Sequence, residues 1–189
     1  MMFKFMAAFY DRFIRFTGID HSGSIPDWLA PVKDMEVLDL GGGTGMNAET
    51  LSRAGAKVTV VDASQAMLRR ATAKNMSAVI LHAKAEDLPL PDEAFDIVLI
   101  SDAWHHFRDQ AGVISEIVRV LRPAGRLYII DFDASRRMTK TLAFFERLLA
   151  EPSAFPEPDV LVETLRQAGI EGAYRDLKFD QFIYCGIKK

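Results

Sequence analysis

At 189 residues, of which 49% are hydrophobic and 26% charged, the chain has the composition of one ordinary globular domain with a full hydrophobic core. Its formal net charge of −3 indicates no nucleic-acid partner, and its single cysteine, Cys185, excludes an internal disulfide framework or a multi-cysteine metal site. No apolar run reaches the roughly 18 residues of a membrane-spanning helix, so we expect a cytoplasmic protein without stable membrane insertion.

The first segment with a helical pattern spans residues 3–17. Charged residues directly after its apolar start argue against a signal peptide. Three roles fit this helix: a cover laid over the core, a lid across a ligand with Tyr10 pointing inward, or a helix on a membrane surface. Its apolar face consists of Met2, Met6, Phe9, Phe13 and Phe16.

From residue 35 onward, predicted strands alternate with predicted helices. After a short helix at 26–29, we expect strands at 35–40, 57–61, 78–81, 95–100 and 126–130, and helices at 45–54, 64–74 and 109–121. This alternation predicts a parallel sheet with helices on both faces and a ligand crevice at the carboxyl ends of the strands. Helices at 139–149 and 158–168 and β-rich runs at 173–178 and 181–188 suggest an antiparallel pair that finishes the sheet.

A glycine-rich turn follows the first predicted strand. Its glycines, Gly41, Gly43 and Gly45, form a Gly-x-Gly-x-Gly pattern, and Asp39 lies two residues before the first of them. Glycine allows a positive φ and a close approach of ligand to backbone, and the helix that follows offers free N–H groups to an anion. A dinucleotide fingerprint needs glycine at the sixth position, where this chain has Met46.

Asp62 ends the second predicted strand, 21 residues after Gly41. A carboxylate at this place can accept hydrogen bonds from two adjacent ribose hydroxyls, as adenosine recognition requires. The alternative role, capping of the next helix, already has a better candidate in Ser64. We therefore predict that Asp62 binds a ribose.

Three further motifs follow in order: AEDLPLP at 85–91, FDIVLIS at 95–101 and RVLRPAG at 119–125. With the glycine turn they resemble the class I S-adenosylmethionine-dependent methyltransferases, and within these the small-molecule branch that includes ubiquinone/menaquinone-type C-methyltransferases. The resemblance covers about residues 35–132. It implies an α/β, Rossmann-like, doubly wound and mostly parallel seven-stranded sheet with an antiparallel last strand, here with an N-terminal lid helix.

The resemblance also implies a cofactor site for S-adenosyl-L-methionine, with S-adenosyl-L-homocysteine as product. The glycine turn would surround the methionine end, Asp62 would take the ribose hydroxyls, and Ala85 would offer its backbone N–H to the adenine. The full set of residues expected to bind the cofactor is Tyr10, Asp39, Gly41, Gly42, Gly43, Asp62, Ala63, Met67, Ala85, Glu86 and Ser101.

The chain departs from its relatives at Lys84, where they usually carry an aspartate that meets the adenine amino group. An ammonium group has no acceptor and cannot make that bond. Either Glu86 or Asp87 substitutes for the aspartate, or the backbone and packing alone hold the adenine. We expect a lower cofactor affinity as one consequence.

Two clusters near the crevice have more than one interpretation. His105 and His106 follow the fourth strand and could pack in the core, contact cofactor or substrate, or remove a proton; adjacent histidines rarely share a metal, and we expect none. Trp104 could form a wall or a cation–π contact with the sulfonium. The basic group formed by Arg136, Arg137 and Lys140 is either a solvated helix face or a site for an acidic substrate group.

The whole chain is predicted to form one domain, with an N-terminal lid at 1–31, a cofactor-binding core at 35–132 and C-terminal elements at 133–189. Its expected function is methylation of a small, apolar or aromatic acceptor by a monomer or homodimer. Such a reaction needs alignment and exclusion of water, and a base only if the acceptor must lose a proton. A non-catalytic cofactor-binding subunit and an NAD-dependent oxidoreductase are the alternatives.

Overall fold

The computed structural model describes residues 11–12, 16, 20–148 and 153–189. Most of the predicted N-terminal helix, including Tyr10, lies outside these residues, so its role stays a prediction. Asp11 and Arg12 are helical, and the Asp11 carboxylate accepts a 2.5 Å hydrogen bond from the Thr44 hydroxyl. This contact places residue 11 beside the glycine turn.

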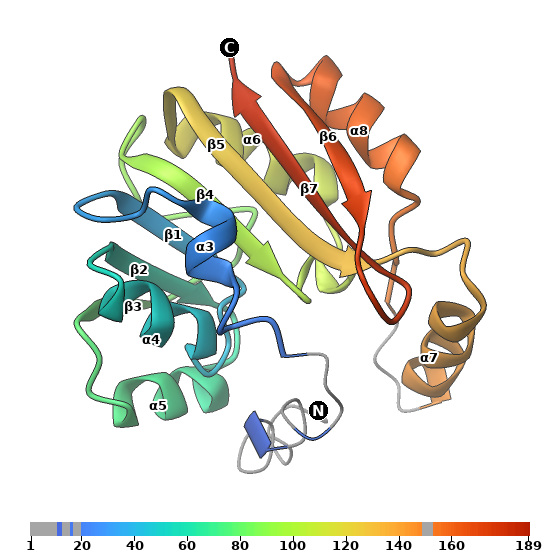
Figure 1. Cartoon of the computed structure of the whole chain (residues 1–189), viewed down its shortest axis with the longest axis horizontal. Helices are drawn as coiled ribbons and strands as arrows, with labels where there is room; N and C mark the ends of the chain where they lie inside the picture. Colours follow the sequence, from blue (N-terminus) through green and yellow to red (C-terminus); the bar gives the residue numbers. More distant parts are fainter. Residues whose placement is uncertain (1–10, 13–15, 17–19, 149–152) are drawn as a thin grey trace.

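Seven strands form one sheet in the order β3-β2-β1-β4-β5-β7-β6. All pairs among the first five strands are parallel, whereas β7 runs antiparallel to both of its neighbours, β5 and β6. The predicted sheet and its antiparallel last strand are therefore confirmed (Figure 1). The strands are β1 (Glu36–Leu40), β2 (Lys57–Asp62), β3 (Ala78–His82), β4 (Phe95–Ser101), β5 (Leu121–Phe132), β6 (Ile170–Asp176) and β7 (Gln181–Lys188).

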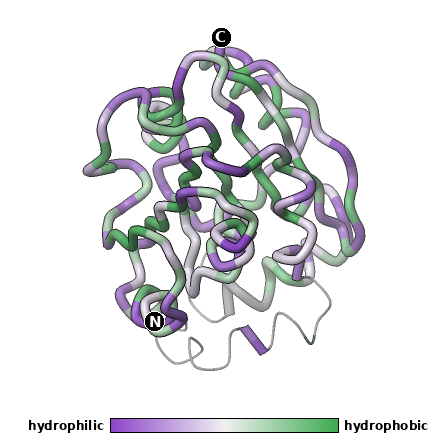
Figure 2. Tube along the Cα trace, turned by 60° about the vertical axis from the view of Figure 1, so that its left-hand side comes forward, coloured by the Kyte–Doolittle hydropathy of each residue, from purple (hydrophilic) through white to green (hydrophobic). Residues whose placement is uncertain are grey.

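Helices cover both faces of the sheet because the strands alternate their apolar side chains between two cores. Val37 on β1 packs in the core under α3 and α4, and its neighbour Leu38 packs in the core under α6 and α8. In Figure 2 the hydrophobic stretches gather toward the middle of the molecule. The helical elements are α3 (Ile25–Leu29), α4 (Met46–Arg53), α5 (Gln65–Ala73), the 3₁₀ turn η1 (Trp104–His106), α6 (Gln110–Val120), α7 (Arg137–Leu148) and α8 (Pro158–Gln167).

Two strands begin earlier than the sequence pattern predicts. β5 starts at Leu121, directly after α6, because Ala124 adopts a φ of +60° and the pairing with β4 shifts register between Phe95 and Ile97. β6 starts at Ile170, whose fully buried side chain anchors a stretch of otherwise poor strand formers. Pairing with β7 thus overrides local propensity.

Among the described residues, no helix combines the length and apolarity needed to cross a membrane. The longest of the described helices, α7, has 12 residues and lies beyond the end of β5, away from the sheet (Figure 1). Because β1, β2 and β4 are parallel neighbours, their carboxyl ends lie at one edge of the sheet, and the loops that follow them meet there.

Candidate functional site

A cavity of about 920 Å³ opens at the carboxyl ends of β1, β2 and β4. The structure brings nine of the predicted cofactor residues to its wall, although they come from the glycine turn, the ends of β2 and β4, α5 and the loop after β3. These residues are Gly41, Gly42, Gly43, Asp62, Ala63, Met67, Ala85, Glu86 and Ser101. Of the other candidates, His106 also lines the cavity, Asp39 and His105 do not, and Tyr10 lies outside the described residues.

The glycine turn between β1 and α4 needs glycine for two separate reasons. Gly41 has a φ of +75°, and a Cβ there would lie 2.6 Å from the Ala103 Cβ. A Cβ on Gly42 would lie 2.7 Å from the Asp39 carboxyl carbon and 2.9 Å from a Val60 methyl. Real Cβ atoms do not approach so closely, so a side chain at either position would collide with the protein packed around the turn.

Asp62 joins the glycine turn to the start of α5. Its Oδ2 accepts a 2.9 Å hydrogen bond from the Gly43 N–H, and its Oδ1 accepts a 2.7 Å bond from the Ser64 N–H. Burial raises the pKa of the Asp62 carboxyl, and the two backbone donors lower it. A carboxylate has about four acceptor positions, so each oxygen keeps capacity for a ligand hydroxyl. Ser64 caps α5 through its own side chain, as predicted.

Asp39, which is expected among the cofactor-binding residues, lies beneath the glycine turn and does not itself line the cavity, so its role toward the cofactor stays a prediction. Strand alternation places Asp39 on the same face as Val37, under Gly42. Burial, followed by the nearby charge of Asp62, raises the pKa of Asp39 to about 7. Asp39 therefore supports the turn from below, and any effect on a ligand passes through Gly42.

The predicted adenine side of the cavity is formed by the loop after β3. Glu86 lines the cavity, whereas Asp87 does not, so Glu86 is the better placed of the two substitutes for the missing aspartate. Lys84 is 74% exposed, with its Nζ 3.9 Å from Glu86 Oε1. His82, which no sequence motif singles out, also lines the cavity and lies 3.0 Å from the Ala63 carbonyl oxygen.

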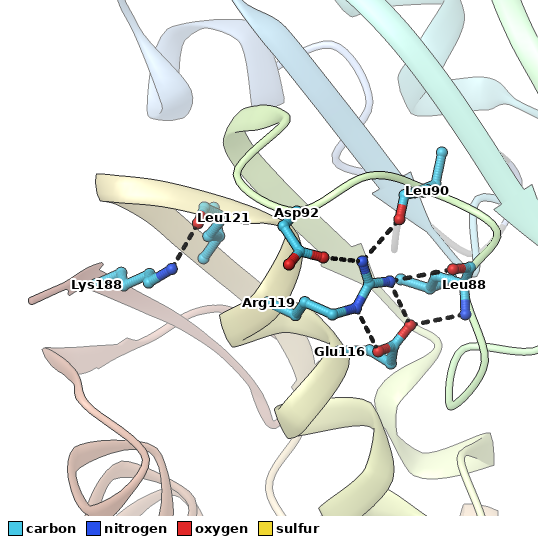
Figure 3. A network of polar contacts seen from close by, with 7 residues as sticks. All are labelled: Leu88, Leu90, Asp92, Glu116, Arg119, Leu121 and Lys188. Atoms are coloured by element: carbon cyan, nitrogen blue, oxygen red, sulfur yellow. Dashed lines mark hydrogen bonds and ion pairs between the residues drawn. The ribbon is translucent and has the colours of Figure 1, made fainter.

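Arg119 on α6 fixes the continuation of this loop (Figure 3). Its guanidinium donates to the carbonyl oxygens of Leu88 and Leu90 at 3.1 and 2.7 Å and pairs with Glu116 and Asp92. Glu116 in turn accepts a 2.8 Å bond from the Leu88 N–H. The arginine of the RVLRPAG motif thus holds a loop whose first residues form the cavity wall.

The two histidine rings after β4 lie 4.0 Å apart between centroids, but only His106 lines the cavity. His105 is buried, donates from Nδ1 to Asp131 Oδ1 at 2.7 Å and stacks on Phe155 at 4.4 Å between ring centroids. This geometry supports the packing role for His105. Trp104 is also buried and packs edge-on against Phe107, so it is neither a cavity wall nor placed for a cation–π contact.

The cavity wall also includes Asp102, which directly follows the FDIVLIS motif on the expected crevice side, and His21, for which the sequence gives no signal. Gln181 at the start of β7 connects them: its Oε1 accepts from His21 Nε2 at 2.8 Å, and its Nε2 donates to Asp102 Oδ1 at 2.7 Å. These residues are far apart in sequence, and only the pairing of β7 with β5 brings them together. No local motif marks His21 or Gln181.

The basic group after β5 does not reach this cavity. Arg136 pairs with Asp133 at 3.0 Å and with Asp176 at 2.9 Å, and neither Arg137 nor Lys140 lines the wall. The alternative of a site for an acidic substrate group therefore has no support here. Within the described part of the chain, no group of three or more His, Cys, Asp and Glu side chains could hold a metal ion.

Comparisons with known proteins agree with this geometry. Residues 38–129 match the family described as "Methyltransferase domain". An uncharacterized methyltransferase of Mycobacterium tuberculosis is 43% identical over 104 residues, which are 55% of this chain and 42% of that relative, so the chain spans less than half of the relative's length. The ubiquinone/menaquinone biosynthesis C-methyltransferase of Roseobacter denitrificans is 31% identical over 181 residues, covering 80% of this chain and 72% of the relative.

Among solved structures, an S-adenosylmethionine-dependent methyltransferase of Thermotoga maritima superposes with a TM-score of 0.81 at 22% identity. The match covers 99% of this chain and 98% of the other. It shows the same Rossmann-like fold. Together with the Roseobacter relative, these matches show that the chain belongs to the class I S-adenosylmethionine-dependent methyltransferases, a family whose cofactor is S-adenosylmethionine.

Proposed function

We propose that the chain transfers a methyl group from S-adenosylmethionine to a small-molecule acceptor. The observation that supports this most is the hydrogen bond from the Gly43 N–H to Asp62, which joins the glycine turn and the predicted ribose carboxylate at one cavity wall. When bound, the cofactor supplies a methyl group on a sulfonium, which is reactive without a metal. The task of the protein is to orient the reactants and exclude water.

Each part of the cofactor has a matching group in the cavity. The exposed backbone at Gly41 and Gly42 suits the methionine end, since no Cβ fits there. Asp62 has acceptor capacity for two ribose hydroxyls. The buried side chain of Met67 and the backbone at Ala85 suit an adenine ring, with Glu86 as the acceptor that replaces the missing aspartate.

For the acceptor, we propose a phenol or hydroquinone-type ring that is methylated on carbon. The Roseobacter relative is named a ubiquinone/menaquinone biosynthesis C-methyltransferase. The wall formed by Ser101, Asp102 and His106 offers polar groups beside the aromatic ring of Phe107. Such a wall suits a flat acceptor with hydroxyl groups on its rim.

The proposal is tested by calorimetry with S-adenosylmethionine and S-adenosylhomocysteine, followed by incubation with methyl-labelled cofactor and a panel of phenols, hydroquinones and amines. We expect binding of both cofactor forms and labelled product with the hydroquinones. Binding without product from any acceptor would favour a cofactor-binding subunit. An NADH fluorescence titration that shows tight binding, with no affinity for S-adenosylhomocysteine, would favour the oxidoreductase alternative and contradict the proposal.

We further propose that the enzyme works in the cytoplasm as a monomer or homodimer and acts on no nucleic acid. Light scattering after size exclusion, with and without S-adenosylhomocysteine, measures the oligomeric state directly. A higher oligomer in both conditions would contradict this part of the proposal.

A further inference from the structure

Three polar side chains form a continuous hydrogen-bonded path from one side of the cavity wall to another. His21 and Asp102 both line the cavity, and Gln181, only 1% exposed, lies between them. The distances are 2.8 Å from His21 Nε2 to Gln181 Oε1 and 2.7 Å from Gln181 Nε2 to Asp102 Oδ1. The path joins the segment before α3, the start of β7 and the loop after β4.

The direction of these hydrogen bonds follows from the chemistry of the amide. An amide oxygen only accepts, so His21 donates from Nε2, and an amide nitrogen only donates, so Asp102 Oδ1 accepts. The path therefore holds Asp102 Oδ1 as an acceptor and fixes the orientation of the carboxyl group. Its second oxygen, Oδ2, lies 3.4 Å from Ser101 Oγ, a long distance for a hydrogen bond that leaves Oδ2 with lone-pair capacity.

The backbone at Asp102 is also unusual. Its φ is +51°, in the left-handed region that aspartate adopts more readily than most residues other than glycine, and its N–H donates to the Ile130 carbonyl at 2.9 Å. Such conformations cluster at functional sites, where the surrounding structure holds a side chain in a required direction. Here the conformation directs a carboxylate to the wall next to Ser101.

Several groups act on this carboxylate. The charges of Asp131 on β5 and His105 on η1 influence it, while Gln181 on β7 and Ser101 on β4 contribute hydrogen bonds. Burial and the like charge of Asp131 raise the pKa of Asp102 to about 7, against the opposite influence of His105 and the two hydrogen bonds. A base whose pKa lies near the working pH is the most effective in proton transfer.

We propose that Asp102 is the general base that takes the proton of a hydroxylated methyl acceptor, with Gln181 and His21 as positioning residues. The inference rests on the methyltransferase function proposed above. In this step the acceptor O–H bond breaks and its proton moves to Asp102 Oδ2. The freed electron pair enters the ring and forms a C–C bond to the transferred methyl group, while the cofactor's sulfur–methyl bond breaks and its electrons neutralise the sulfonium. The ring C–H proton and the Asp102 proton then pass to water and restore the carboxylate and the aromatic ring.

The acceptor gives up two protons, one from its hydroxyl and one from its ring, and its oxygen takes one proton back from water. The net reaction therefore replaces one ring hydrogen by a methyl group and releases one proton. Asp102 therefore acts most strongly on acceptors whose hydroxyl is still protonated at the working pH. An acceptor that is already ionised has no need of the base. This difference separates a catalytic role of Asp102 from a merely structural one.

The main experiment uses the full chain with the substitution Asp102→Asn, which keeps the size of the side chain and an oxygen that accepts from Gln181. Asp27→Asn, at an exposed residue of α3, is the matched control. With an acceptor whose hydroxyl pKa is near 10, we expect kcat of D102N to fall by about 10²–10⁴-fold. With an acceptor already ionised at the assay pH, the fall should be less than about tenfold. Equal losses with both acceptors, or no loss, would overturn the proposal.

The unaltered protein gives a test that does not depend on how the variant folds. With the weakly acidic acceptor, kcat/KM should fall about tenfold per pH unit as the pH drops below about 7, because Asp102 becomes protonated. A profile without this acidic limb contradicts the inference. Product formation by D102N at the wild-type rate would overturn the role of Asp102 alone, whereas absence of cofactor binding by the wild type would refute the proposed function itself.

A binding measurement provides a readout that needs no turnover. In the presence of S-adenosylhomocysteine, 4-nitrophenol should bind the wild type at pH 6 at least about tenfold more tightly than at pH 8, where phenolate and Asp102 carry like charges. D102N should lose most of this pH dependence. The same pH dependence in both proteins would contradict the proposal.

Discussion

Replacement of Asp62 by alanine tests the ribose assignment through a single side chain. Two ribose hydroxyls donating to a charged carboxylate contribute about 1.5–3 kcal/mol each, so their loss should weaken binding by about 3–6 kcal/mol. Since about 1.4 kcal/mol corresponds to a tenfold change, the dissociation constant for S-adenosylhomocysteine should rise by about 10²–10⁴-fold. The ligand-free protein loses only the bonds from Gly43 and Ser64 to the carboxylate, at 2.9 and 2.7 Å.

Both backbone donors lie at an open cavity, so water can replace the carboxylate and the variant should lose only about 1–3 kcal/mol of stability. Calorimetric titration of Asp62→Ala with S-adenosylhomocysteine measures the effect, and circular dichroism verifies that the variant is folded. Asp27→Ala, on the exposed side of α3, is the matched control and should bind like the wild type. A folded Asp62→Ala protein with an affinity within about threefold of the wild type would refute the reasoning.

Four further outcomes are expected. Gly41→Ala forces a Cβ against Ala103, at 2.6 Å, and should abolish detectable cofactor binding in calorimetry. Arg119→Met frees the loop after β3 and should lower both the melting temperature and the cofactor affinity, with unchanged values contradicting the anchoring role. Leu38→Ala empties a fully buried site in β1 and should cost about 2–5 kcal/mol in urea unfolding. The pKa of Asp39 is raised to about 7, so the folded state holds its proton more tightly than the unfolded chain, and stability is lost as pH rises from about 4 to 7. In Asp39→Asn, urea unfolding across this range should show a shallower loss, by up to about 1.4 kcal/mol per pH unit, and an unchanged slope would exclude Asp39 as the cause.

The parts of the fold that could be predicted are those that depend on local sequence patterns. Alternating strands and helices, the glycine turn and a carboxylate at the end of the next strand all depend on neighbours within about 25 residues. The cavity wall formed by Gly43 and Asp62 follows from these patterns, because parallel strands bring their carboxyl ends to one edge. The alternation of side chains along a strand is also sufficient to place Asp39 under the turn.

The parts that could not be predicted depend on long-range pairing. Gln181 reaches Asp102 only because β7 inserts beside β5, and His21 joins them across 160 residues. That His106 lines the cavity and the adjacent His105 does not depends on the 3₁₀ turn, which has no clear signal in the sequence. The lid role of the N-terminal helix and the division of the chain into three parts stay predictions.

The central claim is that the glycine turn and Asp62 together hold S-adenosylmethionine. A crystal structure of the protein grown with S-adenosylhomocysteine tests it most directly. The account predicts both ribose hydroxyls within about 2.5–3.0 Å of the Asp62 oxygens and the methionine end against the backbone of Gly41 and Gly42. S-adenosylhomocysteine bound elsewhere on the molecule, with this cavity filled only by water, would contradict it.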